Sequence, residues 1–291
     1  MIQISNQHLI VTMTQEGGTL TSIRDAKTGR EYLWQGDPAY WTGQAPNLFP
    51  FVGRLYEKTY TLHGKAYPMT IHGFVRHAQM TVEEEQEASC CFLLTDSPET
   101  LAVYPYRFAF RIRYALEGPV LQVAFQVENR SEEPLYCGMG GHPGFNVPLE
   151  EGLTFEDYEL TFPEACTPCQ VVFSPALQVA PERPAYPLEE GRKLPLRHEL
   201  FDLDAVVLAG APRQVTLSSP KGSHGVTVAY PQMPYVGFWH KPQTDAPYVC
   251  IEPWSILPGR DNLVEELSQM PDMTTVAPGQ TFENRWSITI W

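Results

Sequence analysis

The sequence is poor in basic residues and has no long hydrophobic run. Its 20 Lys and Arg residues are outnumbered by 34 Asp and Glu residues, which gives a formal net charge of -14. Nucleic-acid binding requires a basic surface, so this balance argues against DNA or RNA as a partner. No segment approaches the roughly 18 consecutive apolar residues of a membrane span. The opening MIQISNQHLIVTMTQEGG also lacks a secretion signal, and we expect a cytoplasmic protein.

Cysteine is sparse and does not form a metal-binding pattern. The six cysteines stand at positions 90, 91, 137, 166, 169 and 250. Cys166 and Cys169 form a CxxC pair, but a zinc site needs about four ligands and no second pair completes one. His72 and His77 lack a third ligand in the same way. In a reducing compartment we therefore predict free packing thiols and no metal site.

Few segments repeat their apolar residues with the helical period of about 3.6. In most segments apolar residues alternate with others, which is a period of two. In FAFRIRYALEGPVLQVAFQV, residues 108–127, apolar side chains alternate with others on both sides of an EGP turn. This pattern predicts a β-hairpin. About fifteen short strands are predicted in this way, with short helices only at 96–104 and 261–267.

There is no internal repeat and no polar linker. The proline-rich stretch at 163–195 contains hydrophobic segments, so it is predicted to be a long surface excursion of one domain. The sequence therefore predicts an all-β protein, a large antiparallel β-sandwich, with residues 1–291 forming a single domain.

Two histidines lie beside glycine and an aromatic residue, His72 in TIHGF and His142 in GGHPGF. Glycine permits close approach of a ligand, and an aromatic ring can wall a pocket. Both are equally explained as turn histidines. His77 and His240 are weaker candidates, and His8, His63, His198 and His224 are expected to be solvated.

Arg54 and Asn47 occur in the apolar segment APNLFPFVGRL. A guanidinium group in such a segment must pair with a carboxylate or contact a polar ligand, and the sequence leaves both open.

Glu252 is the most informative carboxylate, because it lies inside the apolar segment YVCIEPW. Burial there would raise its pKa and make it a suitable general base near neutral pH. The alternative is a glutamate that points to solvent at a strand end. Asp202 and Asp204 in LFDLDA are not distinguished locally, and Trp239 either stacks on a sugar ring or belongs to the core.

Five fragments follow one another along the chain: NLFPFVGR, IHGF, GGHPGFN, LFDLDA and IEPW. Together they resemble the aldose 1-epimerase (galactose mutarotase-like) family, most closely its LacX-like branch, over nearly the whole chain. The resemblance implies a β-supersandwich with a sugar cleft on one face. It implies His142 as general acid and Glu252 as general base, with the substrate held by Arg54, His72 and Asp204 and with Asn47 beside them.

The implied reaction interconverts the α and β anomers of an aldose. The C1 hydroxyl proton leaves while the ring oxygen gains one, so one base and one acid suffice without a cofactor. The expected ligand is a monosaccharide, and the expected assembly is a monomer or homodimer. On this interpretation, the glycines of GMGGHPGFN leave room for a sugar ring.

Three other functions stay open. One is a non-catalytic carbohydrate-binding protein that uses the same cleft. Another is an epimerase of a hexose 6-phosphate, which needs a basic cluster; Arg54 and Arg76 lie near the motifs, but no further basic group is evident, which favours an unphosphorylated aldose. A glycoside hydrolase or lyase needs two carboxylates, and only Glu252, with Asp204 as a possible partner, lies in a convincing segment.

Overall fold

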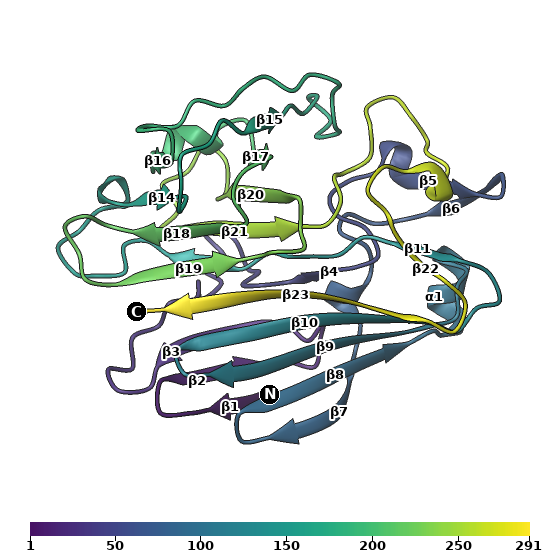
Figure 1. Ribbon diagram of the computed structural model, residues 1–291, viewed down its shortest axis with the longest axis horizontal. Coiled ribbons are helices and arrows are strands. Elements are labelled where there is room, and N and C mark those ends of the chain that lie inside the picture. The colour runs from purple at the N-terminus through teal and green to yellow at the C-terminus, as the bar shows by residue number, and fades with distance from the viewer.

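The computed structural model describes all 291 residues and consists mainly of two antiparallel sheets that share one core (Figure 1). The nine-stranded sheet has the order β16 (Lys193–Pro195), β14 (Glu159–Thr161), β18 (Gln214–Ser218), β19 (Gly225–Ala229), β23 (Thr281–Ile290), β10 (Val120–Asn129), β9 (Phe108–Glu117), β8 (Ser89–Thr95) and β7 (Thr81–Gln86). The seven-stranded sheet has the order β15 (Cys169–Val171), β17 (Val206–Ala209), β20 (Tyr235–Trp239), β21 (Tyr248–Trp254), β12 (Gly140–Gly141) and β4 (Asn47–Leu48), with β13 (Gly144–Asn146) also paired to β21.

Smaller elements complete the molecule. A three-stranded sheet contains β1 (Ile2–Ser5), β2 (Leu9–Met13) and β3 (Leu20–Asp25), and two-stranded sheets join β5 (Thr59–Leu62) to β6 (Lys65–Pro68) and β11 (Leu135–Cys137) to β22 (Thr274–Val276). One α-helix, α1 (Pro98–Val103), is present, with short 3-10 turns at Tyr56–Lys58, Val75–His77, Phe155–Asp157, His198–Phe201 and Leu267–Gln269. The predicted all-β class is confirmed. No helix has both the length and the apolar character needed to span a membrane.

The hairpin of β9 and β10 forms where the alternation predicts it. Its alternating apolar residues are buried, and Gly118 takes the left-handed conformation in the turn. On the inner face, the Phe110 ring stacks on Phe49 at 4.2 Å between centroids. Phe49 follows β4 of the other sheet, so this contact joins the two layers. One cluster of 70 buried residues takes members from both sheets, which is why the layers share a single core.

The structure has more strands than the sequence predicts, because very short strands leave no alternating pattern. Fifteen of the 23 strands have four or more residues, and the other eight have only two or three. The predicted count of about fifteen matches the longer strands. A strand of two residues is too short to show alternation, so β4 and β12 could not be predicted.

One predicted helix is present and the other is not. Ser97 caps α1 through its hydroxyl, within the predicted segment 96–104. The helix predicted at 261–267 is wrong. Glu265 accepts hydrogen bonds from Arg260, at 2.9 Å from the backbone N–H, and its carbonyl accepts one from Thr61 N–H at 2.8 Å. The segment therefore folds back and joins the end of β5 instead of coiling.

The proline-rich stretch at 163–195 packs on the same core. It passes over β17 and β20 at the top of Figure 1 and includes β15 and β16. Within it, Val179 is buried, and its N–H donates to Gly259 O at 2.9 Å. The stretch is thus fixed to the sandwich at its middle as well as at its ends.

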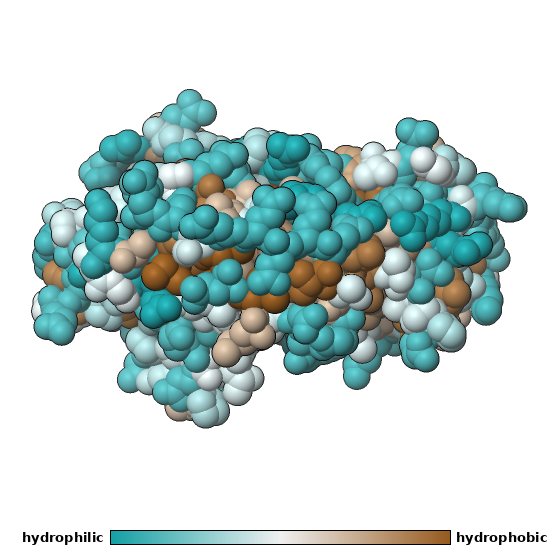
Figure 2. Space-filling model, turned by 90° about the horizontal axis from the view of Figure 1, so that it is seen from below, coloured by the Kyte–Doolittle hydropathy of each residue, from teal (hydrophilic) through white to brown (hydrophobic).

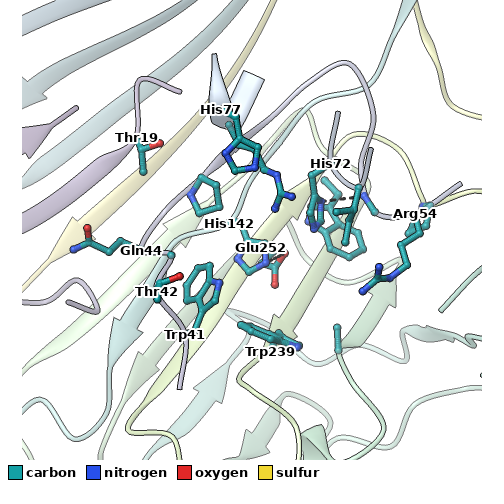
Figure 3. A pocket seen from close by; sticks show the side chains of 18 of the residues that line it. Thr19, Trp41, Thr42, Gln44, Arg54, His72, His77, His142, Trp239 and Glu252 are labelled. Atoms are coloured by element: carbon teal, nitrogen blue, oxygen red, sulfur yellow. Dashed lines mark hydrogen bonds and ion pairs between the residues drawn. The ribbon is translucent and has the colours of Figure 1, made fainter. Parts of the chain in front are cut away.

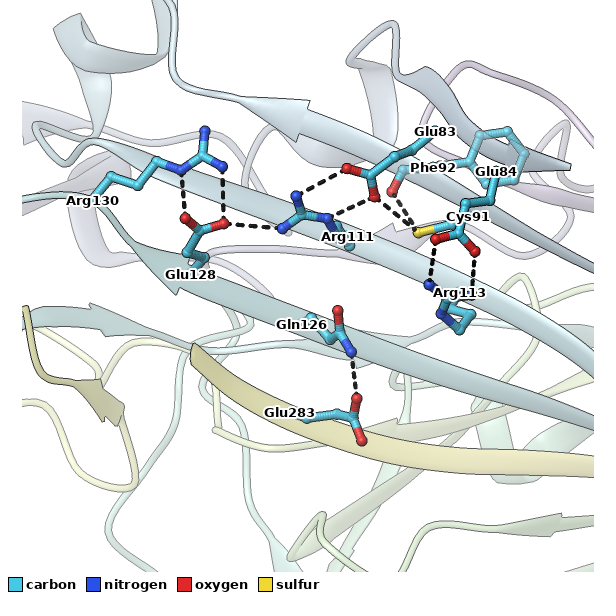
Figure 4. Close-up of polar contacts among 10 residues, drawn as sticks. All are labelled: Glu83, Glu84, Cys91, Phe92, Arg111, Arg113, Gln126, Glu128, Arg130 and Glu283. Carbon is cyan, nitrogen blue, oxygen red and sulfur yellow. Dashed lines mark hydrogen bonds and ion pairs between the residues drawn. The ribbon is translucent and has the colours of Figure 1, made fainter. Parts of the chain in front are cut away.

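The outer face of the nine-stranded sheet is polar. Figure 2, which views the whole molecule from below, shows a mainly hydrophilic surface with a band of apolar residues across its middle. Figure 4 shows the ion pairs on these strands, in which Arg111 contacts Glu83 at 2.7 Å and Glu128 at 3.1 Å, while Arg113 contacts Glu84 at 2.7 Å. The arginines of this face are therefore neutralised by carboxylate partners.

Candidate active site

A cavity of about 680 Å³ opens on the seven-stranded sheet. Six of the seven predicted site residues line it: Arg54, His72, His142, Asp204, Trp239 and Glu252. Figure 3 shows His142, Glu252 and His72 in the middle of the cavity. Arg54 lies on one side of them, and Thr19, Thr42 and Gln44 lie on the other. The volume is typical of small-molecule sites.

Glu252 lies on β21, in which all seven residues are buried. The residue is 1% exposed and pairs in register with Gly237 of β20. Burial raises the pKa of Glu252 well above its ordinary value, and the charge of Asp204 raises it further. The alternative of a solvent-facing glutamate is excluded by this burial.

His142 is held over Glu252 by the chain on both sides of it. Before it, β12 pairs with β21; after it, Gly144 of β13 pairs with Cys250, and Ile251 N–H donates to Pro143 O at 3.1 Å. These contacts place Nε2 of His142 3.3 Å from Oε2 of Glu252. Burial lowers the pKa of His142 to about 3.

Both members of this pair keep unused hydrogen-bonding capacity. Nδ1 of His142 and Oε2 of Glu252 are buried and have no hydrogen-bond partner, and neither has Nε1 of the adjacent Trp254. Buried polar atoms are seldom left without a partner in folded proteins. A polar ligand in the cavity would supply the missing contacts.

His72 presents a fixed tautomer to the cavity. Its backbone is left-handed, with φ of 65°, and its Nδ1 accepts a hydrogen bond from Gly53 N–H at 3.1 Å. Burial holds the pKa of His72 well below its ordinary value, so the ring is neutral and carries its proton on Nε2. The His72 and His142 rings meet edge to face at 5.6 Å. His72 can therefore donate one hydrogen bond to a ligand beside His142.

Asp204 rather than Asp202 reaches the cavity. Asp204 lines it, whereas Asp202 is exposed and outside the lining. The backbone of Asp204 has φ of 102°, a conformation rare for a non-glycine residue and typical of functional sites. Burial raises its pKa, and a hydrogen bond from Trp239 and the charge of Arg54 oppose that shift.

An aromatic wall closes the cavity behind the pair. The Trp239 and Trp41 rings meet edge to face at 5.4 Å, and Trp41 lies against the His142 ring at 5.0 Å. Trp239 is partly exposed and lines the cavity, which excludes its alternative role as a buried core residue. Trp41 and Trp254 were missed in the sequence, although Trp41 lies two residues before Gly43 in the segment YWTGQAP, which could have indicated a pocket wall.

Asn47 does not line the cavity. It is 2% exposed, and its side-chain N–H groups donate to Gly17 O at 2.9 Å, Gly18 O at 3.2 Å and the Tyr114 hydroxyl at 3.0 Å. This placement corrects the expectation that Asn47 stands beside the substrate. The amide instead ties β4 to the turn before β3 and to the opposite sheet.

The glycines of GMGGHPGFN also serve packing. A Cβ at Gly141 would lie 2.6 Å from Trp286, and one at Gly140 would lie 2.8 Å from Pro253 O. A Cβ at Gly138 would collide with Ile256. The expectation that these glycines leave room for a sugar ring is therefore wrong, because protein atoms occupy that space.

The six thiols are all free. Cys250 lies next to His142 and Glu252: possible metal-ligand atoms of the three side chains fall within 4.8 Å of one another. These are the side chains best placed to contact a metal ion.

Comparison with known proteins adds the family to which the chain belongs. The sequence matches the family model described as aldose 1-epimerase over residues 1–289. The chain belongs to this family. It is thus a sugar epimerase, an isomerase, as the sequence resemblance indicated.

Relatives and solved structures agree with this assignment. The protein LacX of Lactococcus lactis subsp. lactis is 37% identical over 99% of both chains. A galactose mutarotase related enzyme from Lactobacillus acidophilus has a TM-score of 0.94 and 34% identity, over 99% of this chain and 96% of its own. A galactose mutarotase-like protein from Lactobacillus casei also has a TM-score of 0.94, at 29% identity over the full length of both chains. The predicted galactose mutarotase-like fold is thereby confirmed.

Proposed function

We propose that this epimerase interconverts the α and β anomers of an aldose monosaccharide, with His142 and Glu252 as its proton carriers. The observation that carries the proposal is the separation of 3.3 Å between Nε2 of His142 and Oε2 of Glu252 at the buried wall of the cavity. Anomerisation moves two protons on neighbouring oxygens, O1 and the ring oxygen. Two carriers this close can serve both oxygens from one side of the sugar.

The reaction begins with proton transfer at both oxygens. Glu252 takes the C1 hydroxyl proton while His142 gives a proton to the ring oxygen, and the C1–O5 bond breaks to give the open aldehyde. Rotation about C1–C2 presents the other carbonyl face, and ring closure returns both protons by the reverse steps. No atom is gained or lost, so no cofactor is required.

Glu252 and His142 together hold one proton throughout this cycle. With the ring closed, Glu252 is ionised and His142 is protonated; with the ring open, both are neutral. Burial favours the neutral state, because it raises the pKa of Glu252 and lowers that of His142. The open-chain intermediate is therefore accompanied by the protonation state that the buried site prefers.

The remaining side chains position the sugar. His72 donates through Nε2, Arg54 donates, and Asp204 accepts, so hydroxyl groups around the ring find both kinds of partner. Trp239 and Trp41 present apolar surface to the ring carbons. A cytoplasmic location is part of the proposal and is supported by the six free thiols.

Polarimetry tests the proposal directly. Freshly dissolved α-D-glucose and α-D-galactose should approach their equilibrium rotation faster with the enzyme than in buffer. A sugar-binding protein without activity would give calorimetric binding of the same sugars and no rate change. No acceleration across a panel of neutral and phosphorylated aldoses would refute the proposal.

A further inference from the structure

A second cavity of about 500 Å³ adjoins the first on the Arg54 side. The two share three lining residues, Arg54, Ile71 and Arg76, so the space beyond the catalytic pair continues past the two arginines. Lys58 lines the second cavity, where Glu57 is the one carboxylate. We call Arg54, Lys58 and Arg76 the cationic cluster.

The cationic cluster has no close carboxylate partner. None of its three members forms an ion pair within 4.0 Å, in contrast to the arginines on the outer face of the nine-stranded sheet. Nε of Arg76 is buried and has no hydrogen-bond partner. The pKa of Arg76 is lowered first by burial and then by the charge of Arg54, so the two guanidinium groups repel each other.

The backbone around the second cavity is unusual as well. Glu57 and Lys58 are consecutive non-glycine residues in the left-handed region, with φ of 52° and 54°. His72, which follows the cavity-lining Ile71, has φ of 65°. Such conformations cost free energy and are concentrated at functional sites.

The two ends of the main cavity differ in charge. Thr19, Thr42 and Gln44 offer neutral hydroxyl and amide groups on one side of His142 and Glu252, and Arg54 lies on the other (Figure 3). In a chain with a net charge of -14, three unpaired cations in one place would focus an attractive field for anions. An anion there would also relieve the repulsion between Arg54 and Arg76.

From these observations the geometry points to an anion subsite: the cationic cluster binds a phosphate monoester carried by the aldose, while C1 lies at His142 and Glu252. A phosphate is preferred to a carboxylate, because its charge of about -2 and three acceptor oxygens match three cationic donors, two of them planar forks. This inference rests on the proposed epimerase activity and names its substrate class. It reverses the sequence-based preference for an unphosphorylated sugar, since Lys58 supplies the basic group that the motifs did not reveal.

The test compares kcat/KM for D-glucose 6-phosphate and D-galactose 6-phosphate with the neutral hexoses and with D-glucuronate, by NMR exchange between anomers. We expect at least one phosphorylated aldose to be preferred over its neutral parent by about tenfold or more, the value of one charge-assisted contact. The preference should fall with added salt. Equal kcat/KM for neutral and phosphorylated sugars would overturn the subsite and leave the epimerase proposal intact, and preference for glucuronate alone would replace phosphate by carboxylate.

Variants locate the effect. Lys58→Met and Arg76→Met should each lower the ratio of phosphorylated to neutral kcat/KM by about fivefold or more, and the neutral sugar is the reference for folding and basal chemistry. Lys27→Met, in an exposed turn outside the lining of both cavities, is the matched control and should keep the ratio of the parent protein. An unchanged ratio in both cluster variants would contradict the inference.

Inorganic phosphate separates this inference from the activity itself. It should bind the unmodified protein and compete with the phosphorylated sugar, and binding should weaken in Lys58→Met. If no sugar is epimerised but phosphate binds in this manner, the proposed function fails and the subsite stands. Absence of both phosphate binding and any phosphorylated-sugar preference refutes the subsite.

Discussion

Nε2 of His142 lies 3.3 Å from Oε2 of Glu252, although the two residues are 110 positions apart in the chain. Three strands from two distant parts of the sequence produce this contact. β21 carries Glu252 in the middle of the sheet, and β12 and β13 pair with β21 on both sides of His142. The pair is therefore fixed by backbone hydrogen bonds, which hold the two proposed proton carriers in place without a bound sugar.

Glu252→Gln should abolish most of the rate acceleration. The amide keeps the shape of the side chain but cannot accept the C1 hydroxyl proton, so kcat should fall by about 10²–10⁴-fold. Polarimetry gives the rate. Glu16→Gln is the matched control, because Glu16 also lines the cavity but is largely exposed at its rim. If both variants lost a comparable part of kcat, the loss would come from removing negative charge from the cavity and not from removing the general base.

The pH dependence of the catalysed rate should follow the buried pair. The active enzyme holds one proton on the pair, and it gains a second only when the pH falls toward the His142 pKa of about 3. The single proton is lost when the pH rises through the raised pKa of Glu252. We therefore expect kcat/KM, corrected for buffer, to be retained well below the ordinary histidine pKa and to fall as the pH rises through the raised pKa of Glu252. An acid limb centred near the ordinary histidine pKa would contradict this assignment.

The same raised pKa predicts that Glu252→Gln stabilises the fold. Because the native state binds the Glu252 proton more tightly than the unfolded chain, this residue lowers stability as pH rises above its ordinary value of 4.5. Glutamine removes that cost, so the free energy of unfolding at pH 7 should rise by about 0.5–2 kcal/mol. The gain should shrink at low pH. Urea unfolding at several pH values measures it, and equal stability of both proteins at every pH would contradict the burial argument.

The sequence predicted what depends on local pattern. The alternation of apolar residues predicted the β9–β10 hairpin. The five fragments, in their order along the chain, pointed to the side chains that converge on the cavity. The resemblance to a known family chose Asp204 over Asp202, which local pattern alone did not separate. The cationic cluster was not predicted, because Lys58 and Arg76 come together only through the packing of two loops.

The misinterpretations have a common cause. A strand of two residues has no alternating pattern that shows which way its side chains point. The inward position of Asn47 in β4 could therefore not be predicted from the sequence. What surrounds a glycine is likewise set by residues distant in the chain, such as Trp286 beside Gly141. The segment 261–267 has helical composition, but its hydrogen bonds to Arg260 and Thr61 favour a loop.

Asn47→Ala should have a larger effect on the free energy of unfolding than on the KM for the sugar. The substitution leaves Gly17 O without the Asn47 donor and removes one donor each from Gly18 O and the Tyr114 hydroxyl oxygen, although the Tyr114 hydroxyl still donates to Gly18 O at 2.8 Å. We expect this loss to cost about 1–3 kcal/mol. Thermal unfolding should show the loss, and Gln86→Ala on an exposed edge strand is the control. A large increase in KM at unchanged stability would restore Asn47 to the substrate site.

Gly141→Ala decides between two explanations of the glycine-rich segment. The added Cβ would lie 2.6 Å from the Trp286 ring, and Gly141 does not have the positive φ that would add backbone strain. Overpacking should therefore cost about 1–3 kcal/mol of stability. It should also lower kcat, since His142 follows directly in the chain and would move with the backbone.

A double-mutant cycle identifies the steric partner. In a Trp286→Phe background the smaller ring leaves room, so Gly141→Ala should cost less there than in the parent protein, measured by urea unfolding. If the cost is the same in both backgrounds, Trp286 is not the obstacle. If Gly141→Ala keeps full stability and raises only the KM for sugar, the glycines do make room for the substrate, and the packing explanation fails. A stability loss relieved by Trp286→Phe would mean that His142 owes its position to the close contact between the two sheets.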